Sequence, residues 1–257
     1  MAGGKLLEIS GKDAEHFLQN LVTNDLSGLD KGLVYAAILT PQGKYLADFF
    51  LMRRGETILL DVAPSMTEGL ARRLTMYRLR ADVQITASDL TVTQLGREID
   101  GALPDPRHPA LGYRLYTDGA LPAEAEAARL SPESFTALRV AHVIPESGIE
   151  LIADDSYILE HGFARLNGVD FRKGCYVGQE VTARMKHKTE LRKGLVQVAI
   201  SGEAPIGSEI LIEGKSAGTL FSQAGGKALA HLRFNRAEGA EMTAADAKMT
   251  WDGQQPG

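Results

Sequence analysis

Hydrophobic and polar positions in the first half of the chain follow two different periods. Apolar residues with a helical spacing begin after a capping-box pattern at 10–13 and end near Asn24. Two continuous apolar runs, 33–39 and 45–52, then flank a five-residue turn that contains a proline and a glycine. The two runs predict a β-hairpin.

The pattern continues with further strands and a helix. A third strand is predicted at 57–62, a second helix opens after Pro64, and another strand follows at 81–87. This order of helix, strands, helix and strand is typical of an antiparallel sheet covered by helices. We therefore predict an α+β fold, and no Gly-x-Gly-x-x-Gly motif indicates a dinucleotide site.

The spacing of apolar and turn-forming residues changes in the second half of the chain. Ser131 followed by Pro132 predicts the start of a helix that runs to about His142. After residue 194, short apolar segments are separated by glycine, proline and serine, which predicts a small terminal barrel or sandwich. A chain of 257 residues is expected to form two or three modules.

The composition is that of an ordinary soluble protein, with 44% hydrophobic and 24% charged residues. A net charge of −5 argues against general nucleic-acid binding, and no stretch is long enough to span a bilayer. One cysteine excludes an internal disulfide, and the first residues lack the apolar run of a signal peptide. We expect a cytoplasmic protein that binds neither nucleic acid nor membrane.

The single cysteine, Cys175, is the most informative residue for chemistry. It is flanked by Gly174 and Gly178, and apolar residues at 177, 181 and 185 predict a helix that opens just after it. Backbone N–H groups at a helix start favour a thiolate. Seven lysines and arginines against three acidic residues give segment 170–194 a net charge of +4, which has the same effect and attracts anions. The alternative is that Cys175 is a small packed residue beside a solvated charged face.

Other chemistry has weaker support in the sequence. The six histidines are scattered without the spacing of a metal site, so no metal site is predicted. Asp48 interrupts the apolar run of the second hairpin strand. An inward carboxylate there needs a partner or a ligand N–H group, whereas strict alternation also allows it to point to water.

The run from Leu166 to His187 closely resembles the signature of the YgfZ family, above all in its core Lys-Gly-Cys-Tyr-x-Gly-Gln-Glu at 173–180. A softer resemblance covers most of the chain, including 21–26, 39–44 and 139–149. YgfZ proteins are folate-binding relatives of the T-protein, the aminomethyltransferase of the glycine cleavage system. They are linked to the assembly or repair of iron-sulfur clusters.

This resemblance implies a T-protein-like cloverleaf of three domains around a central folate cavity, with antiparallel sheets, helices and a C-terminal β-barrel. The expected domains are an N-terminal folate-binding domain at 1–90, a central domain with the cysteine motif at 91–190, and the barrel at 191–257. Asp48 falls at or next to the T-protein aspartate that contacts the reactive nitrogens of the folate.

The resemblance also implies the ligand and its residues. Tetrahydrofolate or a one-carbon derivative is the expected cofactor, and Cys175 is the expected catalytic residue of the cluster-related function. One thiolate supplies at most one cluster ligand, so stable cluster storage by a monomer is not expected. The candidate folate-binding residues are Asp48, Tyr176, Lys173, Gln179, Glu180 and Arg184.

The leading hypothesis is a tetrahydrofolate-dependent accessory factor in the assembly or repair of iron-sulfur clusters. Its expected partners are the folate and iron-sulfur client enzymes or assembly proteins. One alternative is a folate-dependent transferase of aminomethyl or methyl groups, in which Asp48 positions the folate. The other is a non-catalytic folate-binding scaffold in which Cys175 is structural. Whether the chain is an enzyme is left open.

Overall fold

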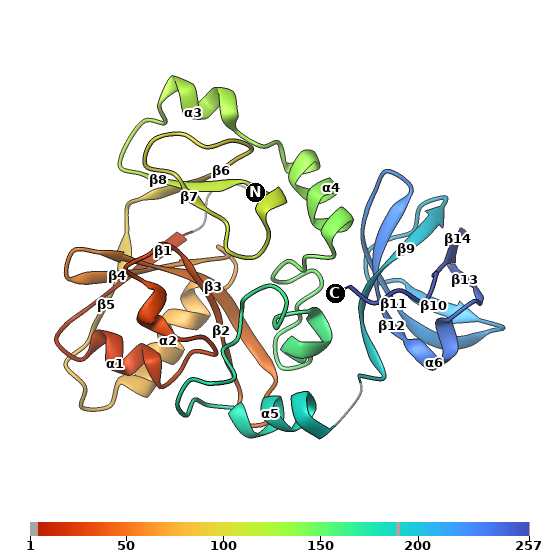
Figure 1. Cartoon of the computed structure of the whole chain (residues 1–257), viewed down its shortest axis with the longest axis horizontal. Helices are drawn as coiled ribbons and strands as arrows, with labels where there is room; N and C mark the ends of the chain where they lie inside the picture. Colours follow the sequence, from red (N-terminus) through yellow and green to blue (C-terminus); the bar gives the residue numbers. More distant parts are fainter. Residues whose placement is uncertain (1–4, 189–190, 257) are drawn as a thin grey trace.

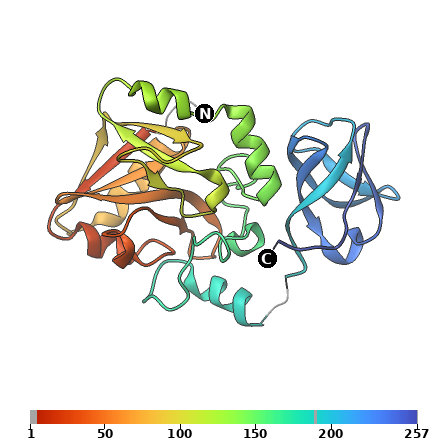
Figure 2. The same cartoon turned by 45° about the horizontal axis from the view of Figure 1, so that its top comes forward.

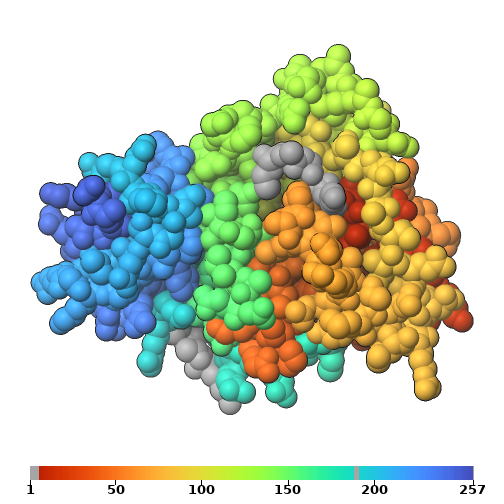
Figure 3. Space-filling model, turned by 180° about the vertical axis from the view of Figure 1, so that it is seen from behind, coloured from red at the N-terminus to blue at the C-terminus, as the bar shows by residue number. Residues whose placement is uncertain are grey.

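The computed structural model describes residues 5–188 and 191–256. Figure 1 shows a larger body built from the N-terminal part of the chain and a barrel built from the C-terminal part. Helix α4 and the segment that follows it lie between the two, and Figure 3 shows the same arrangement from behind, with the green segment packed against the blue barrel. The larger body holds the candidate site.

The first sheet has five antiparallel strands in the order β2-β3-β4-β1-β5. Their bounds are β1 Lys5–Ser10, β2 Val34–Leu39, β3 Tyr45–Arg54, β4 Thr57–Val62 and β5 Gln84–Ser88. Two α-helices pack on one face of it: α1 Ala14–Gln19 and α2 Thr67–Arg78. A short 3-10 helix, η1 Leu26–Gly28, precedes β2.

Both faces of the β2–β3 hairpin are buried. On one face Phe49 joins the core formed with α1 and α2. On the other face Tyr35 and Phe50 pack with side chains from 144–176 of the central segment. Coverage of both faces explains why these strands are continuous apolar runs. It also places Asp48, two residues before Phe50, on the face toward the central segment.

A second, three-stranded sheet has the order β6-β8-β7. Its strands are β6 Thr91–Leu95, β7 Leu103–Pro104 and β8 Tyr113–Thr117, with the 3-10 helix η2 Pro109–Leu111 before β8. The helices α3 Ala123–Ala128 and α4 Pro132–His142 follow. Figure 2 shows this sheet lying over the first one, and Arg114 and Tyr116 of β8 both bond to Asp61 of β4.

The C-terminal strands close into a barrel in the order β10-β11-β12-β9-β14-β13. Their bounds are β9 Lys193–Ser201, β10 Glu209–Ile212, β11 Lys215–Ala224, β12 Lys227–Arg233, β13 Glu241–Ala244 and β14 Ala247–Thr250, with helix α6 Phe234–Ala237 after β12. Small apolar side chains, Met242, Met249 and Trp251 fill the interior. The predicted α+β class with antiparallel sheets and a C-terminal barrel is confirmed.

Buried polar contacts join the barrel to the body. Arg139 of α4 is 1% exposed and donates to Ser222 Oγ of β11 at 3.1 Å. Glu150 is paired with Arg139 at 3.1 Å and accepts a bond from the Ser222 backbone N–H at 3.2 Å. Nearby, the ring of His161, in the 3-10 helix η3 Ile158–His161, stacks on the ring of His231 of β12. The barrel is therefore held through buried ionic groups.

His161 makes this joint sensitive to acid. Burial and the nearby His231 lower the pKa of His161 to about 4, below the value of about 6.5 in the unfolded chain. The unfolded state therefore binds more protons between these values, and stability that is present above pH 6.5 is lost as the pH falls toward 4. We expect this residue to contribute about 3 kcal/mol of that loss.

Denaturant unfolding at several pH values between 7 and 4.5 measures this effect. The variant His161→Gln has no imidazole to protonate, so its stability is expected to fall less steeply than that of the wild type. His16→Gln, at an exposed position of α1, is the matched control and is expected to follow the wild type. Identical slopes for all three proteins contradict the prediction.

Two local predictions were wrong. The capping box at 10–13 does not form, because Ser10 is the last residue of a strand, β1, that the hydrophobic pattern did not reveal. Helix α1 starts instead after Asp13, whose side chain makes no capping bond, and ends early at Gln19. The expected domain limits at 90 and 190 stay a prediction, and the second falls at residues 189–190, outside the described part of the chain.

Candidate functional site

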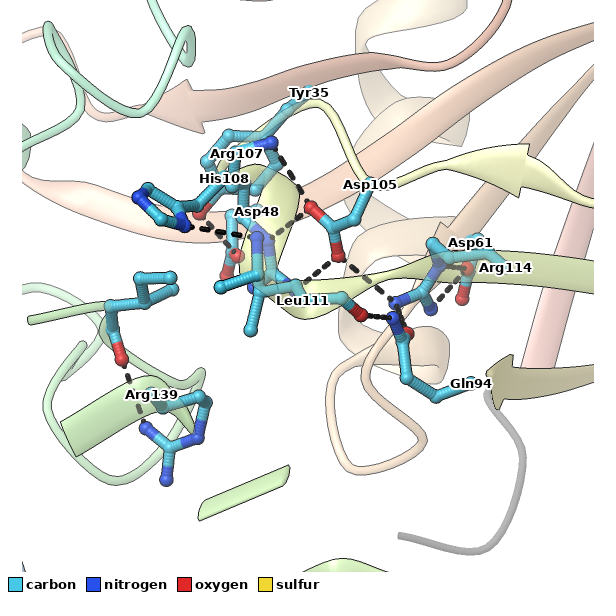
Figure 4. Close-up of polar contacts among 12 residues, drawn as sticks. Tyr35, Asp48, Asp61, Gln94, Asp105, Arg107, His108, Leu111, Arg114 and Arg139 are labelled. Atoms are coloured by element: carbon cyan, nitrogen blue, oxygen red, sulfur yellow. Dashed lines mark hydrogen bonds and ion pairs between the residues drawn. The ribbon is translucent and has the colours of Figure 1, made fainter. Parts of the chain in front are cut away.

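A cavity that is open to solvent lies between the two sheets and α4. Figure 4 shows the polar side chains gathered around it. The residues that line it are Asp48, Phe50, Asp61, Val62, Ala63, Pro64, Val92, Thr93, Gln94, Arg107, Arg114, Arg129, Leu130, Ser131, Pro132, Phe135, Arg139, Glu146 and Ser147. The lining combines apolar side chains with seven charged ones. A concave site with fixed polar groups suits a small organic ligand that is itself polar.

Asp48 is the central acceptor of this cavity and is 6% exposed. One carboxylate oxygen accepts bonds from Tyr45 at 2.6 Å and from the Ser147 hydroxyl, and the other accepts from Tyr35 at 2.8 Å. Burial, reinforced by the Asp48 charge, raises the pKa of both tyrosines, so both remain donors. A carboxylate offers about four acceptor positions. Three hydroxyl donors leave one position for a ligand N–H group.

Tyr45 reaches Asp48 through an irregularity in the hairpin. Strict alternation places residue 45 on the opposite face of β3 from residue 48. The pairing of β2 with β3 shifts between Ile38 and Leu39, so that Leu39 faces Tyr45 while Ile38 faces Ala47. This bulge turns the Tyr45 side chain to the Asp48 face. The simple period of the sequence cannot reveal it.

Two buried ion pairs lie beside Asp48. Arg114 contacts Asp61 at 2.5 Å, and Arg107 contacts Asp105 at 2.7 Å. Both guanidinium groups lie over the ring of Phe50, at 4.2 Å for Arg114 and 4.8 Å for Arg107. Each arginine is already paired with a carboxylate, so neither is a free cation for an anionic ligand. The two pairs fix the shape of the cavity wall and its charge distribution.

Arg139 contributes a different feature. Its guanidinium is paired with Glu146 at 2.8 Å and with Glu150 at 3.1 Å. Its Nε atom is buried and has no hydrogen-bond partner among the described residues. Buried N–H groups without a partner are rare in folded proteins. Arg139 lines the cavity, but its Nε atom is covered by protein atoms, so this N–H does not face the open space.

The cysteine motif lies outside this cavity. Cys175 is exposed, in a loop that ends where helix α5 begins, at Gln179 (α5 Gln179–Lys188). Tyr176 is buried in the core that also contains Tyr35 and Tyr45, so the loop packs against the hairpin that carries Asp48. The thiol is therefore accessible to a partner, while the residue next to it is fixed.

The remaining candidates surround the motif loop. The Gln179 amide donates to the Gly174 carbonyl at 3.4 Å, whereas Glu180 and Arg184 are exposed on α5. None of the candidate folate residues except Asp48 lines the cavity. The structure thus divides the predicted site into two: a cavity around Asp48 and an exposed loop around Cys175.

Lys173 was predicted to bind the folate, and its contacts in the structure do not fit this role. Its side chain is 7% exposed, and its ammonium donates to three backbone carbonyls. Burial lowers the pKa of Lys173 to about 8, against the opposing effects of Asp25 and Asp170. An ammonium has three donors. All are used within the protein, so none is left for a folate carboxylate.

Sequence reasoning did not identify most of the cavity residues. Arg107, Arg114 and Ser147 come from separate segments that no local motif connects. Tyr35 and Tyr45, which bond to Asp48, lie in the two strands of the predicted hairpin, and this was the available signal. No group of three or more His, Cys, Asp or Glu residues in 5–188 and 191–256 is placed to hold a metal ion. No helix within those ranges is long and apolar enough to cross a membrane.

The fold defines the class of protein. It is similar to the solved structure of glycine cleavage system aminomethyltransferase T from Bartonella henselae, with a TM-score of 0.69 over 95% of this chain and 81% of that one, at 16% sequence identity. Residues 192–255 match the family model described as the CAF17 C-terminal beta-barrel domain. The chain therefore has an aminomethyltransferase T-like fold that ends in a CAF17-type barrel.

Two relatives identify the family. The chain is 30% identical to the iron-sulfur cluster assembly factor IBA57, mitochondrial, of Mus musculus, across 92% of this chain and 77% of the relative. It is 32% identical to the Mycosarcoma maydis IBA57 homolog across 78% of this chain, and the match spans 57% of that longer relative. The chain belongs to the IBA57 family of iron-sulfur cluster assembly factors. The predicted YgfZ-type family is confirmed in part: IBA57 is the more specific name that these relatives carry.

The expected cytoplasmic location was wrong. Both relatives are named as mitochondrial proteins, which contradicts it. The expectation rested on a single free cysteine and on the character of the first residues. A free thiol argues against an oxidising compartment but does not distinguish one reducing compartment from another.

Proposed function

We propose that this protein is a tetrahydrofolate-dependent accessory factor in the assembly or repair of iron-sulfur clusters. The folate occupies the Asp48 cavity, and Cys175 acts at the exposed loop. The observation that carries the proposal is the buried Asp48 carboxylate, held by three hydroxyl donors in a cavity of an aminomethyltransferase T-like fold. Family membership supports the cluster-related part.

The lining fits the chemistry of a folate. A reduced pterin is flat and carries N–H groups that seek an acceptor, and Asp48 retains one acceptor position. The side chains of Phe50, Val92 and Phe135 supply apolar contact area. Asp48 thus supplies an acceptor in a cavity whose lining mixes apolar and charged side chains.

Calorimetric titration of the purified chain with tetrahydrofolate tests the folate part. We expect a micromolar dissociation constant, about −8 kcal/mol. Folic acid analogues with the same pterin are expected to compete. A titration without heat, and without competition by analogues in a second binding assay, contradicts the folate part of the proposal and leaves the family assignment unchanged.

Arg129 is the residue we assign to the carboxylated tail of the folate. It lines the cavity and is half exposed, and its contact is an exposed pair with Glu126 at 3.6 Å. The other arginines of the cavity are held by buried carboxylates. Arg129→Ala is expected to weaken tetrahydrofolate binding by about two- to fivefold, the size of an exposed charge pair. The loss is expected to shrink at high salt.

Arg97→Ala is the matched control for this prediction. Arg97 is equally exposed and pairs with Glu124 at 3.3 Å, but it does not line the cavity. Calorimetry on both variants compares them directly. Equal affinities for Arg129→Ala, Arg97→Ala and the wild type contradict the tail assignment.

Cys175 supplies the cluster-related half of the proposal. An exposed thiol on a loop is open to a second protein, and one thiolate provides one ligand or one redox partner at most. Any cluster handled here is therefore cargo shared with a client or assembly protein. The exposed cations Arg172, Arg184 and Lys186 near the loop favour an acidic partner surface.

A second candidate function is a folate-dependent one-carbon transferase. The specific observation in its favour is that Asp48 is buried in the cavity where such a reaction would orient a folate nitrogen. Incubation of the protein with tetrahydrofolate and an aminomethyl donor, followed by detection of methylene-tetrahydrofolate, distinguishes the two. The accessory-factor proposal predicts no turnover, and the transferase requires it.

A further inference from the structure

The motif lysine is held at the end of a helix. The Lys173 ammonium donates to the carbonyls of Gln19 at 2.7 Å, Val22 at 2.6 Å and Asn24 at 3.1 Å. Gln19 is the last residue of α1, and the other two acceptors lie in the turn that follows. Carbonyls at the end of a helix carry partial negative charge and stabilise a cation. No carboxylate among the described residues forms an ion pair with this ammonium.

The segment just before Lys173 is bound to the same turn. Thr23 is fully buried, and its hydroxyl donates to the Gly168 carbonyl at 2.7 Å. The Asp170 backbone N–H donates to the Thr23 carbonyl at 3.1 Å. The Asn24 amide donates to the Asn167 carbonyl at 2.7 Å. The chain entering the cysteine loop is therefore fixed along its length, and Lys173 is the last of these contacts.

The chain leaving the loop is fixed against the hairpin. Gly178 has a φ of +85°, and a Cβ atom there would lie 2.6 Å from the Thr40 carbonyl oxygen in the β2–β3 turn. Only glycine fits such a close approach. The four residues 174–177, which include Cys175, thus span two fixed points. Tyr176 points into the core, and Cys175 is exposed.

We propose that Lys173 is a positioning residue that holds the Cys175 loop in the geometry needed to meet its partner, and that it does not bind the folate. This inference rests on the proposed function in one respect: it takes the Cys175 thiol as the group that acts on the cluster or the partner. Burial of a cation without a carboxylate partner costs stability compared with an apolar side chain of similar length. A role in the placement of Cys175 accounts for a lysine at this position.

The geometry also distinguishes lysine from arginine. The three acceptors converge on a single nitrogen, which matches the compact ammonium group. A guanidinium is planar and presents five donors in a fixed fork. Arginine at 173 therefore keeps the charge but does not reproduce the three contacts, and we expect Lys173→Arg to behave like an uncharged variant.

The test compares Lys173→Met, Lys173→Arg and the control Lys215→Met, which removes an exposed lysine of β11 in the barrel, away from the cysteine loop. The readouts are the rate of Cys175 alkylation by iodoacetamide at a temperature where each protein is folded, tetrahydrofolate affinity by calorimetry, and recovery of cluster-enzyme activity in cells. In both Lys173 variants, the alkylation rate of Cys175 is expected to differ from that of the wild type by about threefold or more. In cells, both variants are expected to restore about tenfold less cluster-enzyme activity than the wild type, or even less. The folate affinity of both Lys173 variants is expected to equal that of the wild type, and so are all three readouts for Lys215→Met.

Three results overturn the inference. Native alkylation in Lys173→Met shows that the contacts do not place the thiol. Lost folate affinity shows that Lys173 serves the cavity. Full recovery by Lys173→Arg shows that charge alone is required. If Lys173→Met does not fold, Lys173→Gln, which keeps one amide donor, is measured in its place and the same outcomes apply.

The alkylation readout separates this inference from the proposed function. It reports on the thiol itself and needs neither a folate nor a partner. If Cys175→Ala restores cluster-enzyme activity, the proposed function fails, whatever the Lys173 variants do. If Cys175→Ala fails to restore activity while Lys173→Met alkylates and functions as the wild type does, only the positioning role fails.

Discussion

Replacement of Cys175 by alanine is expected to leave cluster-enzyme activity close to the level of cells that lack the protein, a loss of about tenfold or more. The side chain is exposed and the chain has no second cysteine to replace it. Stability is expected to change by no more than about 0.5 kcal/mol, because exposed side chains outside special contacts contribute little. The activity of an iron-sulfur enzyme in complemented cells, at matched protein levels, measures the effect.

The controls for this prediction are chemical and positional. Cys175→Ser keeps the size but removes the sulfur, and it is expected to be as inactive as the alanine variant. Ser27→Ala, at an exposed residue of η1, is expected to retain full activity. Full activity of Cys175→Ala at normal protein level would show that the thiol is dispensable and favour the scaffold alternative.

Asp48→Asn is expected to weaken tetrahydrofolate binding by about 10- to 100-fold, the equivalent of losing one hydrogen bond to a charged group. The amide has the same shape but presents N–H donors where Tyr35, Tyr45 and Ser147 also donate. It therefore disturbs the hydroxyl cage and removes the charge that meets the ligand. Calorimetry with tetrahydrofolate measures the change.

The matched control is Asp89→Asn at an exposed position between β5 and β6. Its folate affinity is expected to equal that of the wild type. A circular-dichroism melt establishes that Asp48→Asn is folded at the temperature of the titration. A folded Asp48→Asn protein that binds with native affinity removes Asp48 from the folate site.

The sequence revealed elements whose signals are local. The hairpin formed by β2 and β3 follows from two apolar runs around a turn with proline and glycine. Helix α4 follows from Ser131, whose side chain accepts the Ser134 N–H at 3.1 Å, as expected for a cap before proline. Strand β1 escaped notice because its short pattern pairs with β4 and β5, which lie more than 45 residues away in sequence.

The direction of Asp48 could not be predicted, because alternation identifies a buried face only when one face of a sheet meets water. Here both faces are covered, so an exposed face does not exist for the carboxylate to occupy. Lys173 illustrates a second limit. Its acceptors are the backbone carbonyls of Gln19, Val22 and Asn24. Every residue has a backbone carbonyl, so the residue types at these positions do not identify them as acceptors.

The central claim is that the folate cavity and the thiol loop serve one function although they are separate in space. The most direct test is the recovery of iron-sulfur enzyme activity by Asp48→Asn, which leaves Cys175 intact, in cells that lack the protein. We predict activity close to that of uncomplemented cells at a normal level of folded variant. Recovery equal to the wild type, by a variant that no longer binds tetrahydrofolate, would contradict the claim and separate folate binding from cluster assembly.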